Sequence, residues 1–363
     1  MALTPVTILS GFLGSGKTTL LNRALRDPKL ARTAVVINEF GEVSLDHALV
    51  TQSDDTIMVL ENGCLCCTVF GDLIATLNTL WYRREAGEIP RFDHVVIETS
   101  GLADPAPVAQ AFLSDPTLAG LYRVAQAIVT VDAVNGPGTL DRHSESVRQA
   151  ALADHLLITK LDLVDPSDRP EREAALVARL REVNPAARIT RIDDPSLDVV
   201  ALLGDPGVDP TASDRAVRDW LKIEAYEHAG HEHHGHGEDH DHHGHQHDDG
   251  IASFAFIREE PTSKYALQLL LNSLEQNLGP NLLRVKGLVN VREVPDRPAV
   301  IQGAQHLLSN ISWLERWPDE DRRTKIVFIT QNFERAAIEE MIGLLDRVAT
   351  RTARARERAQ TAN

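Results

Sequence analysis

The segment Gly11–Thr19, which reads Gly-Phe-Leu-Gly-Ser-Gly-Lys-Thr-Thr, constrains the fold more than any other part of this sequence. It follows an apolar run, Val6–Ser10, and precedes Thr19–Leu25, which has a helical pattern. A strand, a glycine-rich turn and a helix in this order are typical of the phosphate-binding loop of P-loop NTPases. We therefore predict an α/β domain whose first strand leads into a nucleotide site.

Each residue type in this loop suits one contact with a nucleotide. The glycines let successive backbone N–H groups face the phosphates, and the helix that follows adds a favourable dipole. Lys17 is expected to reach the β- and γ-phosphates, and the Thr18 hydroxyl is expected to bind Mg²⁺. The candidate nucleotide-binding residues of the loop are Gly11, Gly14, Ser15, Gly16, Lys17, Thr18 and Thr19.

Short apolar runs alternate with helical stretches as far as about residue 205. Several runs are continuously apolar, which favours strands that are buried on both faces of a mainly parallel sheet with helices on either side. The loops after such strands meet at one edge, where open α/β sheets bind their ligands. The expected strands are Pro5–Ser10, Thr33–Asn38, Ile57–Leu60, His94–Glu98, Ala127–Val131, Leu156–Thr159 and Arg188–Ile192.

Two of these strands end in further nucleotide-site candidates. Glu98 ends a buried strand, where a carboxylate can hold Mg²⁺ or its waters, and Gly101 is a candidate γ-phosphate sensor through its N–H. The sequence Thr159-Lys160-Leu161-Asp162 is similar to the guanine-specificity element Asn-Lys-x-Asp, with Thr159 in place of asparagine. A carboxylate at Asp162 can accept hydrogen bonds from the N1 and N2 donors of guanine, and Lys160 can lie over the base.

The three cysteines of the chain, Cys64, Cys66 and Cys67, lie within four residues. This spacing favours a metal site over a redox pair or inert buried thiols, because thiolates bind Zn²⁺, Cu(I), Co²⁺ and Ni²⁺. Three ligands leave one tetrahedral position open, which suits an ion that must later leave. Water, Glu39, Glu42 or a side chain of a partner is a candidate fourth ligand.

The segment Asn38-Glu39-Phe40-Gly41-Glu42, with Asp46 slightly beyond it, lies where P-loop GTPases carry a switch. Such a switch is ordered by the γ-phosphate and Mg²⁺ and released on hydrolysis. Glu39 is a candidate for positioning the attacking water, and Asp46 is a candidate nucleotide-binding residue. If the switch packs on the thiols, nucleotide state and metal affinity are thermodynamically linked.

Composition narrows the partners. The formal net charge is −16 with no long basic block, which argues against nucleic acid. No apolar run approaches the roughly 20 residues of a membrane span, and the first residues do not form a secretory signal. Three clustered cysteines cannot form a disulfide framework, so a reducing cytoplasmic compartment is expected.

Three further regions follow the nucleotide domain of residues 1–205. Residues 206–250 contain ten of the fifteen histidines, between His228 and His247, and are expected to form a flexible linker. The histidines can bind metal weakly, so this segment is a metal antenna, a metal buffer or a plain solvated linker. Residues 251–350 are expected to form a smaller α+β domain with a final helix over Phe333–Val348. Residues 351–363 are expected to be a fraying tail.

Taken together, these motifs resemble the CobW family of P-loop GTPases, which is related to the UreG and HypB metallochaperones. The matching motifs are Gly11–Thr19, Asn38–Glu42, Cys64–Cys67, Glu98–Pro105 and Thr159–Asp162, and the C-terminal match comprises Leu282–Leu288, Val300–His306 and Trp317-Pro318.

The resemblance implies a GTPase that uses GTP and Mg²⁺ and holds a metal, commonly Zn²⁺, at Cys64, Cys66 and Cys67 for delivery to a metal-requiring client protein. The C-terminal domain is expected to recognise clients or to mediate self-association. Alternatives are a Co²⁺ chaperone for cobalamin synthesis or nitrile hydratase activation, a nucleotide-switched storage or sensor protein, and an ATP-dependent small-molecule kinase. The last alternative leaves the thiols and histidines without a role.

Overall fold

The computed structural model describes residues 3–38, 57–60, 68–207, 213–229, 250–305, 307–308 and 311–361. The chain divides into two compact units, Met1–Val208 and Asp209–Asn363. Among the described residues, no helix combines the length and the apolar character that a bilayer crossing requires.

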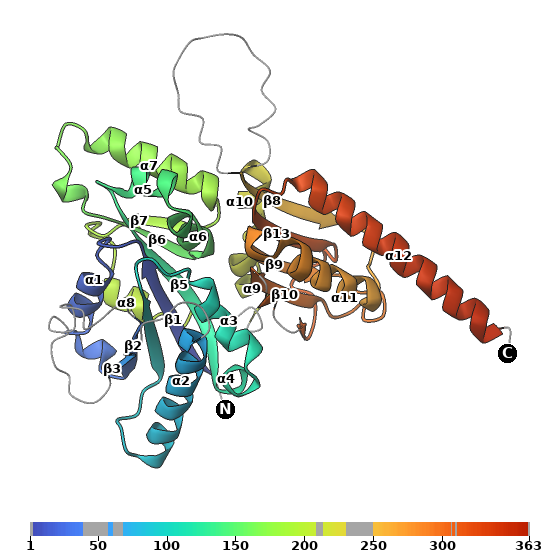
Figure 1. Ribbon diagram of the computed structural model, residues 1–363, viewed down its shortest axis with the longest axis horizontal. Coiled ribbons are helices and arrows are strands. Elements are labelled where there is room, and N and C mark those ends of the chain that lie inside the picture. Colours follow the sequence, from blue (N-terminus) through green and yellow to red (C-terminus); the bar gives the residue numbers. More distant parts are fainter. Residues whose placement is uncertain are drawn as a thin grey trace, which may run out of the picture. The chain divides into compact units, whose positions relative to one another are not determined.

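The first unit is built on a parallel sheet of seven strands in the order β3-β2-β4-β1-β5-β6-β7. Figure 1 shows this sheet with helices packed around it. The prediction of an α/β fold with a mainly parallel sheet is confirmed. Its strands are β1 (Thr4–Gly11), β2 (Thr33–Asn38), β3 (Ile57–Leu60), β4 (His94–Thr99), β5 (Tyr122–Asp132), β6 (His155–Thr159) and β7 (Arg188–Arg191).

Helices cover both faces of this sheet because successive strand residues point to opposite sides. On one face, Val6 and Ile8 pack with α2 and the α3–α4 pair; on the other, Leu9 and Ile37 pack with α1 and α8. The helices of this unit are α1 (Lys17–Ala24), α2 (Thr68–Ala86), α3 (Ala106–Ser114), α4 (Pro116–Leu121), α5 (Gly136–Arg142), α6 (Ser144–Leu152), α7 (Arg169–Val183) and α8 (Val199–Leu203).

The second unit contains an antiparallel sheet in the order β11-β10-β9-β13-β8, with β12 paired to β10. Helices α11 and α12 pack on one face around Phe254, Val285 and Phe328. Its elements are α9 (Asp214–Leu221), α10 (Ile223–Ala229), β8 (Ile251–Arg258), α11 (Lys264–Ser273), β9 (Leu282–Val289), β10 (Ala299–Ala304), β11 (Leu307–Leu308), β12 (Ser312–Trp313), β13 (Thr324–Gln331) and α12 (Arg335–Thr361).

Two boundary predictions in this unit are wrong. The stretch assigned to a flexible linker contains two helices, α9 and α10. Helix α9 is stabilised because Val217, Trp220 and Leu221 are buried and the Ser213 hydroxyl caps its N-terminus. The final helix does not end at Val348 but continues to Thr361, through the stretch predicted to fray. Alanine and arginine dominate that stretch, and both favour helix. The histidines from His231 to His247 lie outside the described residues.

Candidate nucleotide site

The glycine-rich loop connects β1 to α1 at the carboxyl edge of the parallel sheet (Figure 1). Gly11 has φ of +139°, and a Cβ atom there would lie 2.4 Å from the Thr130 carbonyl oxygen. Only glycine fits at this point, because the loop runs directly against β5. The Ser15 side chain is buried and its hydroxyl lies 2.6 Å from that of Thr130, so β5 also fixes the middle of the loop.

Lys17 is the first residue of α1, and its side chain folds back over the loop. Its Nζ donates to the carbonyl oxygens of Gly11 at 2.8 Å and Phe12 at 3.2 Å. The ammonium group is therefore held above the turn, where a bound phosphate would lie. Two other predicted site residues are exposed: Gly14 in the loop and Thr19 in the first turn of α1.

Thr18 and Glu98 meet directly at the end of β4. The Thr18 hydroxyl donates to Oε1 of Glu98 at 2.6 Å, and Glu98 is 1% exposed. Strands β1 and β4 are parallel neighbours with Leu9 opposite Glu98, so the loop and the carboxylate leave the sheet at the same level. Two hard oxygen donors at this distance fit the ligand preference of Mg²⁺.

The loop after β4 lies against the glycine-rich loop. A Cβ atom on Gly101 would lie 2.7 Å from the backbone N and Cα atoms of Leu13, so a larger residue would push the two loops apart. From α6, the Gln149 amide donates to the carbonyl oxygens of Gly101 at 3.2 Å and Ala103 at 3.0 Å. Gln149 is 1% exposed, so this contact is an internal brace of the loop.

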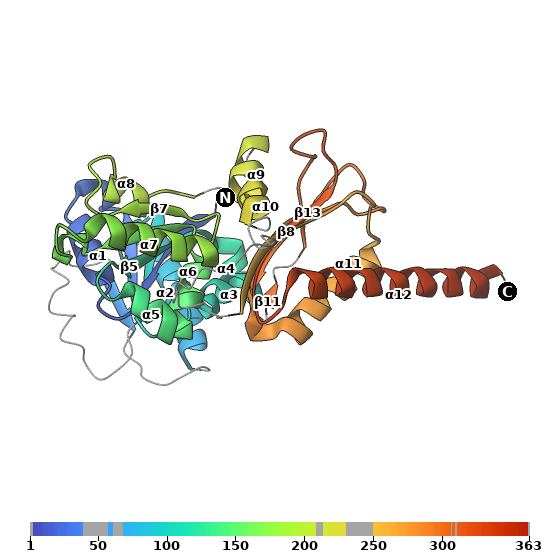
Figure 2. The same cartoon turned by 90° about the horizontal axis from the view of Figure 1, so that it is seen from above.

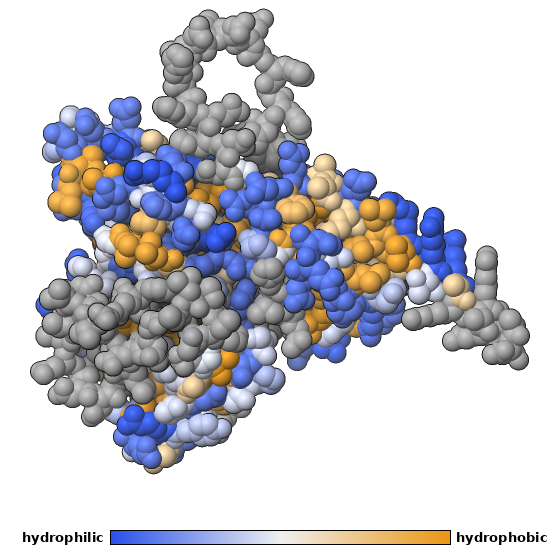
Figure 3. Space-filling view, in the orientation of Figure 1, coloured by the Kyte–Doolittle hydropathy of each residue, from blue (hydrophilic) through white to orange (hydrophobic). Residues whose placement is uncertain are grey.

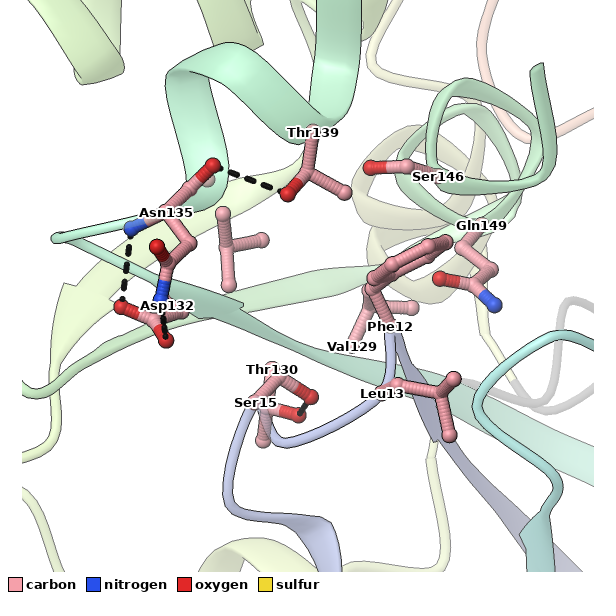
Figure 4. Close-up of a pocket in the computed structure, with 12 residues that line it drawn as sticks. Phe12, Leu13, Ser15, Val129, Thr130, Asp132, Asn135, Thr139, Ser146 and Gln149 are labelled. Carbon is pink, nitrogen blue, oxygen red and sulfur yellow. Dashed lines mark hydrogen bonds between the residues drawn. The ribbon is translucent and has the colours of Figure 1, made fainter. Parts of the chain in front are cut away.

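Sequence reasoning missed Gln149. The available signal was a single amide side chain directly before the small apolar run Ala150–Ala153. Figure 4 shows Gln149 beside a hollow next to the glycine-rich loop, with Phe12 and Leu13 from the loop and Ser146 from α6 around it. The Phe12 ring also lies 4.7 Å from the ring of His143, which precedes α6.

The predicted base-recognition element follows β6. Thr159 is buried, and its hydroxyl donates to the Ser15 carbonyl oxygen at 2.7 Å, which joins this element to the phosphate loop. Lys160 has a left-handed backbone with φ of +59°, and its Nζ donates to Oδ2 of Asp132 at 2.8 Å. Asp162 lies in the following 3₁₀ turn with an exposed side chain, available to a ligand.

Asp132, at the end of β5, is a second residue that sequence reasoning missed. Burial by itself would raise its pKa, but hydrogen bonds from Lys160, from the Asn135 side chain and from two backbone N–H groups outweigh burial and lower the pKa. Asp132 therefore remains ionised and holds the Lys160 ammonium in place. Its signal was a strand-end acid in Val131-Asp132-Ala133, on the strand next to β6.

The remaining predicted site residues lie outside the described part of the chain. These residues are Glu39, Glu42, Asp46, Cys64, Cys66 and Cys67. Among the residues that the structure describes, no group of three or more histidine, cysteine or acidic side chains is arranged to hold a metal ion.

Comparison with known families gives two matches that follow the two units. Residues 5–191 match the CobW/HypB/UreG nucleotide-binding domain, and residues 251–344 match the cobalamin synthesis protein CobW C-terminal domain. This chain belongs to the CobW/HypB/UreG family. The predicted resemblance is thereby confirmed.

Relatives of similar length support this assignment. The zinc chaperone YjiA of Escherichia coli is 30% identical over 89% of this chain and 93% of its own length. The zinc chaperone CobW of Pseudomonas aeruginosa is 32% identical over 93% of this chain and 90% of its own. The solved structure of the zinc-bound YjiA GTPase from E. coli is 26% identical, covers 95% of this chain and 99% of that one, and superposes with a TM-score of 0.65. The protein described here is a P-loop GTPase of this family.

Proposed function

We propose that this protein hydrolyses GTP at the glycine-rich loop and uses the GTP cycle to bind Zn²⁺ at Cys64, Cys66 and Cys67 and to release it to a metal-requiring client. Relatives named zinc chaperones, with matching length and both domains in common, support this proposal. The observation that carries it is the common sheet edge from which both the nucleotide loop and the chain toward the thiols emerge.

For GTP hydrolysis, we assign roles to the residues that lie at the carboxyl edge of the parallel sheet. Lys17 binds the β- and γ-phosphates, Thr18 and Glu98 hold Mg²⁺ and its waters, and the Gly101 N–H contacts the γ-phosphate. Mg²⁺ held by Thr18 and Glu98 would neutralise charge that develops on the phosphates. A water positioned by a carboxylate, with Glu39 as our candidate, attacks the γ-phosphorus while the bond from that phosphorus to the β–γ bridging oxygen breaks. The products are GDP and inorganic phosphate, and the proton of the attacking water is released with the phosphate.

Guanine selection is assigned to the loop after β6. Asp162 accepts from the N1 and N2 donors of guanine, and Lys160, fixed by Asp132, covers the base. Thr159, which stands where the element usually has asparagine, joins this loop to the phosphate loop, because its hydroxyl donates to the Ser15 carbonyl oxygen. Guanine preference is therefore expected despite the threonine.

The connectivity of the chain supports the proposed link between the nucleotide site and the thiols. Strands β2 and β3 are parallel neighbours in the same sheet as β1 and β4, so all four end at one edge. Cys64 is four residues beyond Leu60, and four residues reach at most about 14 Å. Glu39 directly follows Asn38, which pairs with Thr99 next to Glu98. The length of chain therefore allows the thiols and the switch residues to approach the Mg²⁺ ligands, which supports the proposal.

The proposal is tested by measuring Zn²⁺ affinity against a chromophoric chelator, with GDP and with a non-hydrolysable GTP analogue. The background is a variant whose histidines between His231 and His247 are serine, which removes the weak sites. We expect Cys66→Ala to weaken Zn²⁺ binding by at least about 100-fold, because even outer-shell residues contribute 10–100-fold at metal sites. We also expect different affinities in the GTP and GDP states. Unchanged binding by Cys66→Ala, or equal affinities with both nucleotides, would refute the coupling.

A further inference from the structure

Helix α12 has an inner face that packs on its own unit. Ile338 and Ile342 are buried in the core formed with the antiparallel sheet and α11, and Ala349 is buried as well. Asp346 on the same side accepts hydrogen bonds from Arg258 and from the Thr262 hydroxyl. These contacts fix the rotation of the helix about its axis, so the sides of the helix that face away from the core are fixed as well.

One of those sides, next to the inner face, carries a second and largely apolar stripe. Leu344 and Val348 are each 49% exposed, although both are large aliphatic residues. They belong to a series with alternating spacings of four and three residues, which is the pattern of a coiled-coil seam. The series is Ala337, Met341, Leu344, Val348, Arg351 and Ala355. Met341 is half-buried at the edge of the unit's own core, and the other five members are exposed. We call it the outer seam. Figures 1 and 2 show α12 running beyond the sheet and α11, and Figure 3 shows apolar residues at the surface over these helices.

The charges beside the outer seam are separated along the helix. Glu334 and Glu340 flank its first half, and Arg347, Arg351 and Arg354 occupy its second half. All five side chains are exposed. Within the described part of the chain, none of the five forms an ion pair with another residue, whereas Glu339, off the seam, pairs with Arg335 at 2.7 Å. One surface therefore carries both halves of a complementary charge pattern.

We propose that the outer seam of α12 binds the outer seam of a second copy of this chain, antiparallel, about a two-fold axis near Ile342. Antiparallel pairing places Met341 beside the partner's Leu344 and Glu340 beside the partner's Arg347, twice by symmetry. Parallel pairing would instead place Glu340 beside the partner's Leu345 and Arg347 beside the partner's Thr352, so neither charge would meet an opposite one. Self-complementary charge thus selects a second copy over an unrelated partner.

The paired region spans Arg335 to Arg351 of α12, about 25 Å of helix at 1.5 Å per residue, with Glu334 directly before it. A single helix pair of this length is a small interface, in the class of transient contacts that bury less than about 1,200 Å². The proposal therefore concerns a weak, concentration-dependent dimer whose association decreases with salt, because its flanking charges are exposed. It is independent of the proposed metal chemistry.

Sedimentation velocity of the full chain over a concentration series tests the dimer, without nucleotide and with a chelator so that neither ligand contributes. We expect the wild type to shift from one to two chains per particle as its concentration rises. Glu340→Arg and Arg347→Glu should each weaken the dimer about tenfold or more, by opposing like charges twice. An equimolar mixture of these two variants should associate as the wild type does, since both flanking contacts of a mixed pair then join an arginine to a glutamate.

Glu339→Arg is the matched control, with the same charge change one residue away on a different face of α12. It should associate like the wild type, and all variants should keep wild-type GTP hydrolysis and helix content. Three results would each overturn the proposal. They are a wild type that remains a single chain throughout, equal weakening by Glu339→Arg and Glu340→Arg, and a variant mixture that stays dissociated.

Discussion

At the scale of single residues, the contact between Thr18 and Glu98 makes the sharpest prediction. We expect Glu98→Gln to slow GTP hydrolysis by about 100-fold, the loss seen when one electrostatic contact to a transition state is removed. The neutral amide keeps the size of Glu98 and its hydrogen bond to Thr18 but no longer attracts Mg²⁺. Phosphate release at saturating GTP, titrated with Mg²⁺, measures the effect. If Glu98→Gln kept the wild-type rate and the wild-type Mg²⁺ dependence, Glu98 would not be a Mg²⁺ ligand of this site.

Gln149 is predicted to act through the loop after β4. Replacement by leucine leaves the carbonyl oxygens of Gly101 and Ala103 without their internal donor, a cost of about 1–3 kcal/mol. Because that loop is assigned to the γ-phosphate, we expect hydrolysis to fall about tenfold or more while GDP affinity stays at the wild-type value. Nucleotide titration measures the GDP affinity, and single-turnover kinetics measure the rate of hydrolysis. Equal losses in GDP binding and hydrolysis would indicate a purely structural role.

Asp162 is predicted to choose the base. In Asp162→Asn the side chain gains an N–H donor, which suits the 2-oxo group of xanthine better than the 2-amino group of guanine. We therefore expect GTP affinity to fall and xanthosine triphosphate affinity to rise, each by about tenfold or more. Competition binding with both nucleotides gives the ratio, and adenosine triphosphate serves as the control. An unaltered ratio would place the base elsewhere.

At the scale of elements, a side-chain contact between the paired strands β1 and β4 makes the stability of the first unit depend on pH. His94 on β4 is buried with its Nε2 3.0 Å from the Thr7 hydroxyl of β1, and burial lowers the pKa of His94 to about 4. The unfolded chain, with a histidine pKa near 6.5, takes up the proton first as the pH falls. Stability is therefore highest above about pH 6.5 and decreases between pH 6.5 and 4, by about 3 kcal/mol for this group.

We expect the free energy of unfolding of His94→Gln to change less between pH 6.5 and 4 than that of the wild type, because glutamine does not titrate and can still reach Thr7. Urea unfolding at several pH values between 4 and 7 measures the slope for variant and wild type. His143→Gln, which removes an exposed histidine of the same unit, is the control. If both variants show the same slope, the burial of His94 does not cause the pH dependence.

At the scale of the whole molecule, the two units have separate hydrophobic cores, one around Ile8 and Ile97 and one around Val285 and Phe328. A ligand that binds one folded unit stabilises that unit by about 2.7 kcal/mol at 100 times its Kd. We expect Mg²⁺ with a GTP analogue to raise Tm by about 5–10 °C for the unit of residues 1–208. Hydrogen exchange during heating assigns each transition, and equal stabilisation of both units would contradict independent cores.

The sequence alone was sufficient for the parallel sheet and the glycine-rich loop. Continuous apolar runs such as Val95–Ile97 specify buried strands, and the glycine-rich loop with Lys17 and Thr18 specifies its own turn, because these signals are local. The strand predictions Thr33–Asn38 and Ile57–Leu60 agree with the structure at both ends. The residue assignments at the nucleotide and metal sites remain predictions.

Tertiary structure alone decided which distant residues meet. Gln149 contacts Gly101 across 48 positions, and Asp132 contacts Lys160 across 28, distances along the chain that no local pattern encodes. The outer seam of α12 was hidden for the same reason. Leu344 and Val348 look like core residues in the sequence, and only the packing of Ile338 and Ile342 inward shows that they face outward. Local propensity determines the elements, but only the contacts between elements determine which face of each is left for another molecule.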